Sequence, residues 1–162
     1  MSSTAVPETL HASPRRKLLA WLPTLLWLCV LALFSTDIFS AEHTARVLTR
    51  IFYALFGGVS SHGFGIIHFL IRKAAHFTSY GVLSALSFFS WRATLPARRR
   101  WSFLWCQLAL LLTLFAASLD EFHQTFVASR TGNYRDVVLD MIGALFFQVV
   151  LAFWLARKSA AI

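Results

Sequence analysis

Acidic, basic and hydrogen-bonding side chains occur together in three short stretches of this sequence, and each stretch adjoins a long apolar run. In the first, Lys73, His76 and Tyr80 stand three or four residues apart, so a helix would place them on one face. In the second, the adjacent acids Asp120 and Glu121 would be separated by about 100° around a helix. A histidine beside carboxylates provides general acid–base capacity, because neighbouring acids and burial can separate their pKa values.

The remaining candidates stand close to these acids in the sequence. Gln124 shares a helix face with Asp120 and could orient a substrate, while Arg130 has the planar fork that binds phosphate through two hydrogen bonds. Asp136 and Asp140 are one helical turn apart at the start of the last apolar run. We predict catalytic roles for His76, Asp120 and Glu121, and substrate-binding roles for Lys73, Tyr80, Gln124, Arg130 and Asp136.

A structural role is the alternative for each of these residues. Lys73 or Arg130 could pair with Asp120 or Asp136 and lock the helix ends together. An ionisable side chain within a membrane span costs roughly 2.5–3.5 kcal/mol on insertion scales, and such residues are kept mainly where they pair or function. One or two pairs would suffice to fix a helix bundle, so the whole set exceeds what a structural role requires.

The composition indicates an apolar environment for most of the chain. Its 162 residues are 57% hydrophobic and 14% charged, against roughly 45–50% and 25% in soluble domains. A chain of this size could not bury that apolar surplus in one core. The net charge of +8 comes from short basic clusters beside apolar runs. This arrangement is typical of membrane proteins and argues against nucleic-acid binding.

The apolar runs predict an all-α, integral membrane four-helix bundle over residues 18–157. Each run is long enough to cross a bilayer core of about 30 Å as a helix. Between the first two runs, Val47, Leu48 and Ile51 recur at helical spacing, which predicts a short amphipathic extracytoplasmic helix in the headgroup layer. A glycine-rich turn that includes Gly65 is expected to follow it. The expected spans are about 18–36, 68–91, 101–119 and 137–156, with a disordered tail over 1–17 and a short end over 158–162.

The basic clusters also predict the orientation of the chain. With four spans, Arg15 to Lys17, Arg98 to Arg100, and Arg157 with Lys158 lie on one side of the membrane. Because cytoplasmic segments are enriched in Lys and Arg, we expect that side, with both termini, to be cytoplasmic. His76 and all the acids except Glu8 are then expected on the extracytoplasmic side.

Three ordered motifs stand out: Lys73-x-x-His76-Phe-x-x-Tyr80, then Asp120-Glu121-x-x-Gln124-x-Phe126, then Arg130, Asp136 and Gly143. Together they resemble the VanZ-like family, small bacterial membrane proteins named for a member associated with teicoplanin resistance. The resemblance implies a multi-pass protein of the bacterial inner membrane with a role in the cell envelope. Two positions differ, since the family often has Pro-Gly where Ala128 and Ser129 stand and Asn where Asp140 stands. The resemblance covers about residues 18–157.

Two functions fit this set of residues. The first is an enzyme that acts on a lipid-linked headgroup or cell-envelope precursor in the outer leaflet, with a link to glycopeptide susceptibility implied by the resemblance. The second is a non-catalytic membrane protein that binds a lipid, an antibiotic or a partner protein. A transporter is disfavoured, because four spans are few and no ionisable residue stands in the cytoplasmic half. Membrane lipid or a lipid-linked precursor is the expected partner, and the oligomeric state stays open.

The cofactor requirement is left open by the sequence. A divalent metal could be bound by His76, Asp120, His123 and Asp136. Their spacing matches no standard metal motif, so a metal is not favoured. The sequence also contains no glycine-rich phosphate loop and no nucleophile elbow.

Overall fold

The computed structural model describes residues 13–36, 40–58, 60–95, 101–127 and 132–160, with side chains described as far as Arg157. These residues form five α-helices and no β-strand, which confirms the all-α prediction. The helices are α1 (Pro14–Phe34), α2 (Ala41–Phe56), α3 (Ser61–Thr94), α4 (Phe103–Gln124) and α5 (Tyr134–Ala160).

Among the described residues, three helices are long and apolar enough to cross a membrane: α1, α4 and the Tyr134–Arg157 part of α5. Large apolar side chains on their outer faces stay exposed, for example Leu19, Phe115 and Phe153. Such surfaces require lipid as their solvent, so the chain is a membrane protein. Of the four predicted spans, the second is the exception. Helix α3 passes the same test only together with α2, as a pair bent by 120°.

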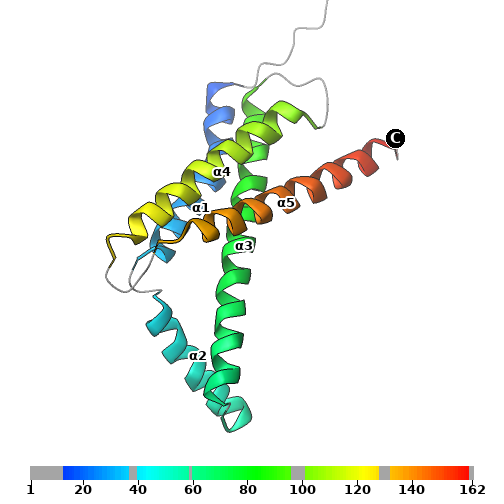
Figure 1. Cartoon of the computed structure of the whole chain (residues 1–162). Helices are drawn as coiled ribbons and strands as arrows, with labels where there is room; N and C mark the ends of the chain where they lie inside the picture. The colour runs from blue at the N-terminus through cyan, green and yellow to red at the C-terminus, as the bar shows by residue number, and fades with distance from the viewer. Residues whose placement is uncertain (1–12, 37–39, 59, 96–100, 128–131, 161–162) are drawn as a thin grey trace, which may run out of the picture.

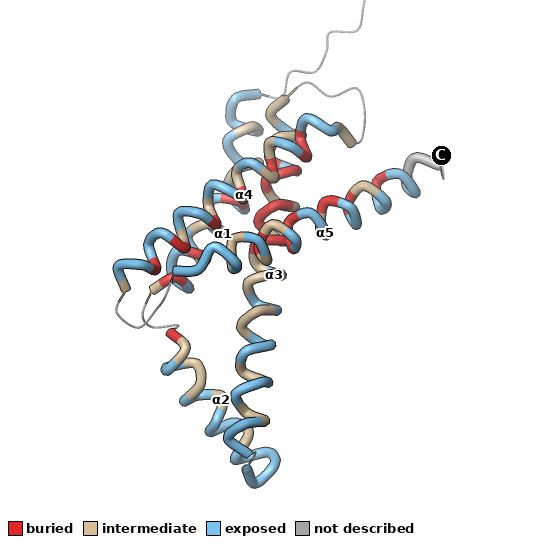
Figure 2. Tube along the Cα trace, in the orientation of Figure 1, coloured by how far each residue is buried: buried red, intermediate tan, exposed pale blue. Residues whose placement is uncertain are grey.

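Helix α3 is the centre of the fold and contacts each of the other four helices. Helices α1, α4 and α5 pack against its C-terminal half, whereas α2 runs beside its N-terminal half (Figure 1). All buried residues of α3 lie between Tyr80 and Ser90. Figure 2 shows the same concentration of buried positions where α1, α4 and α5 meet α3. The core therefore surrounds only half of the longest helix.

Polar contacts join α1 and α5 to this part of α3. The buried hydroxyls of Thr24 and Ser90 are 2.9 Å apart, and the Trp27 indole donates to the Ser79 carbonyl at 2.9 Å. From α5, the Gln148 amide donates to the Ser84 carbonyl oxygen at 2.9 Å. Inside a membrane, helices gain little from burying apolar side chains against each other, so hydrogen bonds of this kind help to select the contacts.

The helix boundaries differ from the prediction where capping residues act. Ser13 and Ser60 accept hydrogen bonds from backbone N–H groups at the starts of α1 and α3, so both helices begin earlier than expected. The glycine-rich turn is correspondingly short. It contains Gly57, whose φ of 70° ends α2, whereas Gly65 lies inside α3. Of the predicted N-terminal tail, residues 1–12 lie outside the described residues.

The close contact between α3 and α5 depends on Gly143. A Cβ atom added at this glycine would collide with the Phe77 backbone carbonyl. Ala144 beside it is fully buried. Small residues such as these allow two helices to approach closely. Gly143 follows Asp140 by three positions, and Phe77 directly follows His76, so this contact brings the two ionisable residues together.

Candidate functional site

Asp120 on α4 is held by two hydrogen-bond donors. The Tyr80 hydroxyl donates to its Oδ2 atom at 2.9 Å, and the Gln124 amide donates to the same oxygen at 3.1 Å. Tyr80 and Gln124 are 2% and 5% exposed. The bond from Gln124 shows that Asp120 and Gln124 share a face of α4, as the four-residue spacing predicts. Two buried donors therefore fix the direction of the Asp120 carboxylate.

Two further pairs join α3 to α5 and follow one another along both helices. The Nδ1 atom of His76 lies 3.2 Å from Oδ1 of Asp140, and one helical turn away the Lys73 ammonium forms an ion pair with Asp136. Asp140 is fully buried, whereas the Lys73 and Asp136 side chains are 30% and 19% exposed. The pairing of Lys73 with Asp136 is one of those that a structural role predicts.

The Glu121 side chain points into the protein and is buried there. It is 5% exposed, and its Oε2 atom accepts the Asn133 backbone N–H at 2.7 Å. The chain beside Asn133 packs closely on α4, since a Cβ atom at Gly132 would collide with the Glu121 carbonyl. Among the residues that the structure describes, Glu121 Oε1 and Asp140 Oδ2 are buried without a hydrogen-bond partner.

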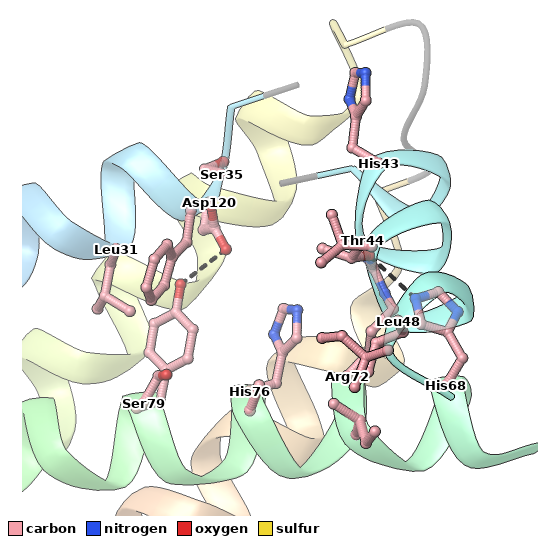
Figure 3. A pocket seen from close by; sticks show the side chains of 16 residues that line it. Leu31, Ser35, His43, Thr44, Leu48, His68, Arg72, His76, Ser79 and Asp120 are labelled. Atoms are coloured by element: carbon pink, nitrogen blue, oxygen red, sulfur yellow. Dashed lines mark hydrogen bonds between the residues drawn. The ribbon is translucent and has the colours of Figure 1, made fainter. Parts of the chain in front are cut away.

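A cavity of about 660 Å³ opens beside these residues, between α3 and the helices α1, α2 and α4. Its walls are largely apolar, with Leu31 from α1 and Leu48 from α2 among them. His76, Tyr80 and Asp120 also line it. Figure 3 shows Asp120 on one side of His76 and Arg72 on the other. The cavity thus combines apolar walls with an acid, a histidine and an arginine.

The structure therefore gathers seven of the eight predicted site residues around the junction of α3, α4 and α5. His76, Tyr80 and Asp120 share the cavity, and Gln124, Lys73 and Asp136 support them through the contacts above. Glu121 is buried in the helix junction and is not among the residues that line the cavity. The eighth, Arg130, lies outside the described residues.

One residue of this junction was not among the predicted site residues. Asp140 was noted for its spacing from Asp136, which could have identified it as a partner for α3. The structure buries Asp140 completely and pairs it with His76, whereas the more exposed Asp136 meets Lys73. Which of two acids one turn apart faces the histidine depends on the rotation of α5 against α3.

The residues that could bind a metal also differ from the predicted set. Donor atoms of His76, Glu121 and Asp140 all lie within 4.8 Å of one another. Of the predicted ligands, His76 alone belongs to this cluster. His123 instead lies with its Nδ1 atom 3.1 Å from the Ser35 hydroxyl of α1. Acid and histidine donors from three helices thus converge at one buried point.

The arrangement has the elements of acid–base chemistry at the edge of an apolar cavity. A carboxylate that hydrogen-bonds one ring nitrogen orients a histidine and selects which nitrogen exchanges a proton with a substrate. Asp140 stands in this relation to His76, which lines the cavity. Arg72 one turn away supplies a cation suited to phosphate.

Comparison with known proteins places this chain in a family. The family model described as VanZ/LLP1 matches residues 20–155. No curated protein and no solved structure matches the chain. The matched region contains α2, α3 and α4 and most of α1 and α5, and thereby the whole junction described above. The chain belongs to the VanZ/LLP1 family of membrane proteins.

Proposed function

We propose that this protein binds a lipid with an anionic headgroup at the extracytoplasmic side of a bacterial inner membrane and acts chemically on that headgroup. One observation carries the proposal. A cavity of about 660 Å³ joins apolar walls to the side chains of Arg72, His76 and Asp120. Its volume is within the range of about 300–1,000 Å³ that small-molecule sites occupy. An acyl chain suits the walls, and an anionic headgroup suits the arginine.

In this proposal the C-terminal half of α3 crosses the membrane with α1, α4 and α5, so that the protein has four spans. Both termini then lie in the cytoplasm, in agreement with the basic clusters at Arg15 to Lys17 and at Arg157. Helix α2 lies in the extracytoplasmic headgroup layer. Its apolar residues Val47 and Ile51 line the cavity, and the rest of the protein leaves them 56% and 47% exposed. Lipid would cover them.

The proposed chemistry assigns a proton-carrying role to His76. Asp140 holds its Nδ1 atom, so Nε2 is the nitrogen that exchanges a proton with the headgroup. Asp120, held by Tyr80 and Gln124, is the second acid–base group at the cavity. Arg72 and the Arg130 side chain are proposed to bind phosphate oxygens. The substrate class is a phospholipid or another lipid-linked phosphate of the cell envelope.

A binding assay tests the first half of this proposal. Purified protein in detergent is titrated by calorimetry with short-chain phosphatidylglycerol, which is anionic, and with short-chain phosphatidylcholine, which has no net charge. We expect preference for phosphatidylglycerol and a loss of about tenfold or more in Kd for Arg72→Gln, since a hydrogen bond to a charged group contributes about 1.5–3 kcal/mol. Arg92→Gln, at the other end of α3, is the matched control. Equal binding of the two lipids, or equal loss in both variants, contradicts the proposal.

A second experiment separates catalysis from binding without turnover, which is the alternative function. Lipid extracts from cells that express the wild-type protein or His76→Ala are compared by mass spectrometry. An enzyme yields a product with an altered headgroup that His76→Ala does not form, although the variant still binds phosphatidylglycerol. Identical lipid profiles would leave a protein that binds a lipid, an antibiotic or a partner. Teicoplanin susceptibility of the same cells provides the phenotype.

A further inference from the structure

We propose that His76, Glu121 and Asp140 bind one divalent transition-metal ion, Zn²⁺ or Mn²⁺, where α3, α4 and α5 meet. Each helix contributes one ligand. A histidine with two carboxylates is a donor set that suits these ions, and three protein ligands leave a coordination position open for water or substrate. The set differs from the four ligands considered from the sequence, because Glu121 and Asp140 replace Asp120, His123 and Asp136.

The distances within the cluster agree with a shared ion. Two ligands on a tetrahedral ion with bonds of about 2.1 Å are roughly 3.4 Å apart. His76 Nδ1 and Asp140 Oδ1 are 3.2 Å apart, and an ion bound by both atoms would replace the hydrogen bond between them. All three residues have donor atoms within 4.8 Å of one another. Small side-chain rotations therefore suffice to bring all three onto a single ion.

The burial of the two acids points to a missing positive charge. Asp140 is 0% and Glu121 5% exposed, and each has an oxygen with no hydrogen-bond partner within the described part of the chain. A buried carboxylate is costly unless it is paired, protonated or bound to a metal. Lys73 is engaged with Asp136, and His76 pairs with one of the two buried acids, Asp140. A dication would neutralise both acids and use the oxygens that have no partner.

The position of this ion connects it to the cavity. His76 belongs to both the ligand cluster and the cavity lining, so the open coordination position can reach a bound molecule. The existence of the metal site does not depend on the proposed lipid. Its role does rest on the proposed function: the ion would bind an oxygen of the phosphate headgroup and stabilise negative charge there.

Calorimetry with the full-length protein tests the metal site. The protein carries a tag without histidine, is purified in detergent, is stripped of metal with a chelator, and is titrated with ZnCl₂ and with MnCl₂. We expect one ion per chain for the wild type. Glu121→Gln and Asp140→Asn keep the shape of the side chain and remove its charge. Each should weaken the Kd at least about tenfold, since even the loss of a residue that only orients a ligand costs 10–100-fold.

Asp120→Asn is the matched control, because it makes the same acid-to-amide change at the residue next to Glu121. It should keep the wild-type stoichiometry and lose less affinity than either ligand variant, since Asp120 supplies no ligand atom. Melting temperatures of the metal-free proteins establish that each variant folds, and His76→Gln replaces any variant that does not. In the wild type, Zn²⁺ should raise the melting temperature, and in Asp140→Asn this rise should disappear.

Three results would overturn the metal site. The wild type could bind neither ion, the bound ion could survive both Glu121→Gln and Asp140→Asn, or Asp120→Asn could lose as much affinity as they do. The phosphatidylglycerol titration is repeated on metal-free protein, so the two proposals fail separately. Metal binding without lipid binding refutes the proposed function, and lipid binding without metal binding refutes the metal site.

Discussion

His76 and Asp140 are 64 positions apart in the sequence, and their Nδ1 and Oδ1 atoms lie 3.2 Å apart across the contact of α3 with α5. The pair depends on how closely the two helices approach, which Gly143 permits at the Phe77 carbonyl. A packing position without any ionisable group thus determines the geometry of the site. The predictions below test this packing, the polar contacts around the site and the orientation of the chain.

Gly143→Ala should destabilise the protein by about 1–3 kcal/mol, because the added methyl group must push α5 away from the Phe77 backbone. Gly65→Ala is the control, since an added Cβ there meets nothing within 4 Å and the change improves helix propensity. Thermal unfolding in detergent measures both. Equal stability of the two variants would mean that α3 and α5 do not meet at Gly143.

Lys73 and Asp136 should show a favourable coupling of about 1 kcal/mol in a double-mutant cycle of Lys73→Ala and Asp136→Ala. The pair is partly exposed, so water screens it and the coupling is smaller than that of a buried pair. Unfolding of the two single variants and the double variant in detergent provides the cycle. Strictly additive losses would exclude a direct interaction.

Tyr80→Phe should cost about 1–3 kcal/mol of stability, because it removes the hydrogen bond to Asp120 while it keeps the buried ring. The same change at Tyr53, which is 69% exposed, should have no measurable effect. The melting temperatures of the two variants in one detergent give the comparison. If Tyr80→Phe unfolds at the wild-type temperature, the hydroxyl does not support the site.

Cysteines placed at Tyr134 and at Arg157 should react with an impermeant thiol reagent from opposite sides of the membrane. The two positions mark the ends of one candidate span, and the proposed orientation puts Tyr134 on the extracytoplasmic side. The experiment uses a background with Cys29→Ala and Cys106→Ala. Intact cells should label position 134, and position 157 only after lysis. Labelling of both in intact cells would rule out this orientation.

Much of the fold could be predicted from the sequence, because it follows from local patterns. A run of apolar residues about as long as the bilayer core predicts a spanning helix wherever it stands, and α1, α4 and α5 fulfil this. Spacing of three or four residues places side chains on one helix face, and the hydrogen bond of Gln124 to Asp120 follows from it. Helix starts were less accurate, because single capping residues such as Ser60 determine them.

The sequence by itself therefore determined that this is an all-α membrane protein and which residues have chemical capacity. Only the tertiary structure decided how they combine. It paired His76 with Asp140 and Lys73 with Asp136. It also buried Glu121 in the helix junction and placed His123 beside Ser35. The physical reason is that spacing within one helix sets a side chain's direction about that helix. The rotation of one helix against another depends on contacts between distant residues, such as Gly143 with Phe77.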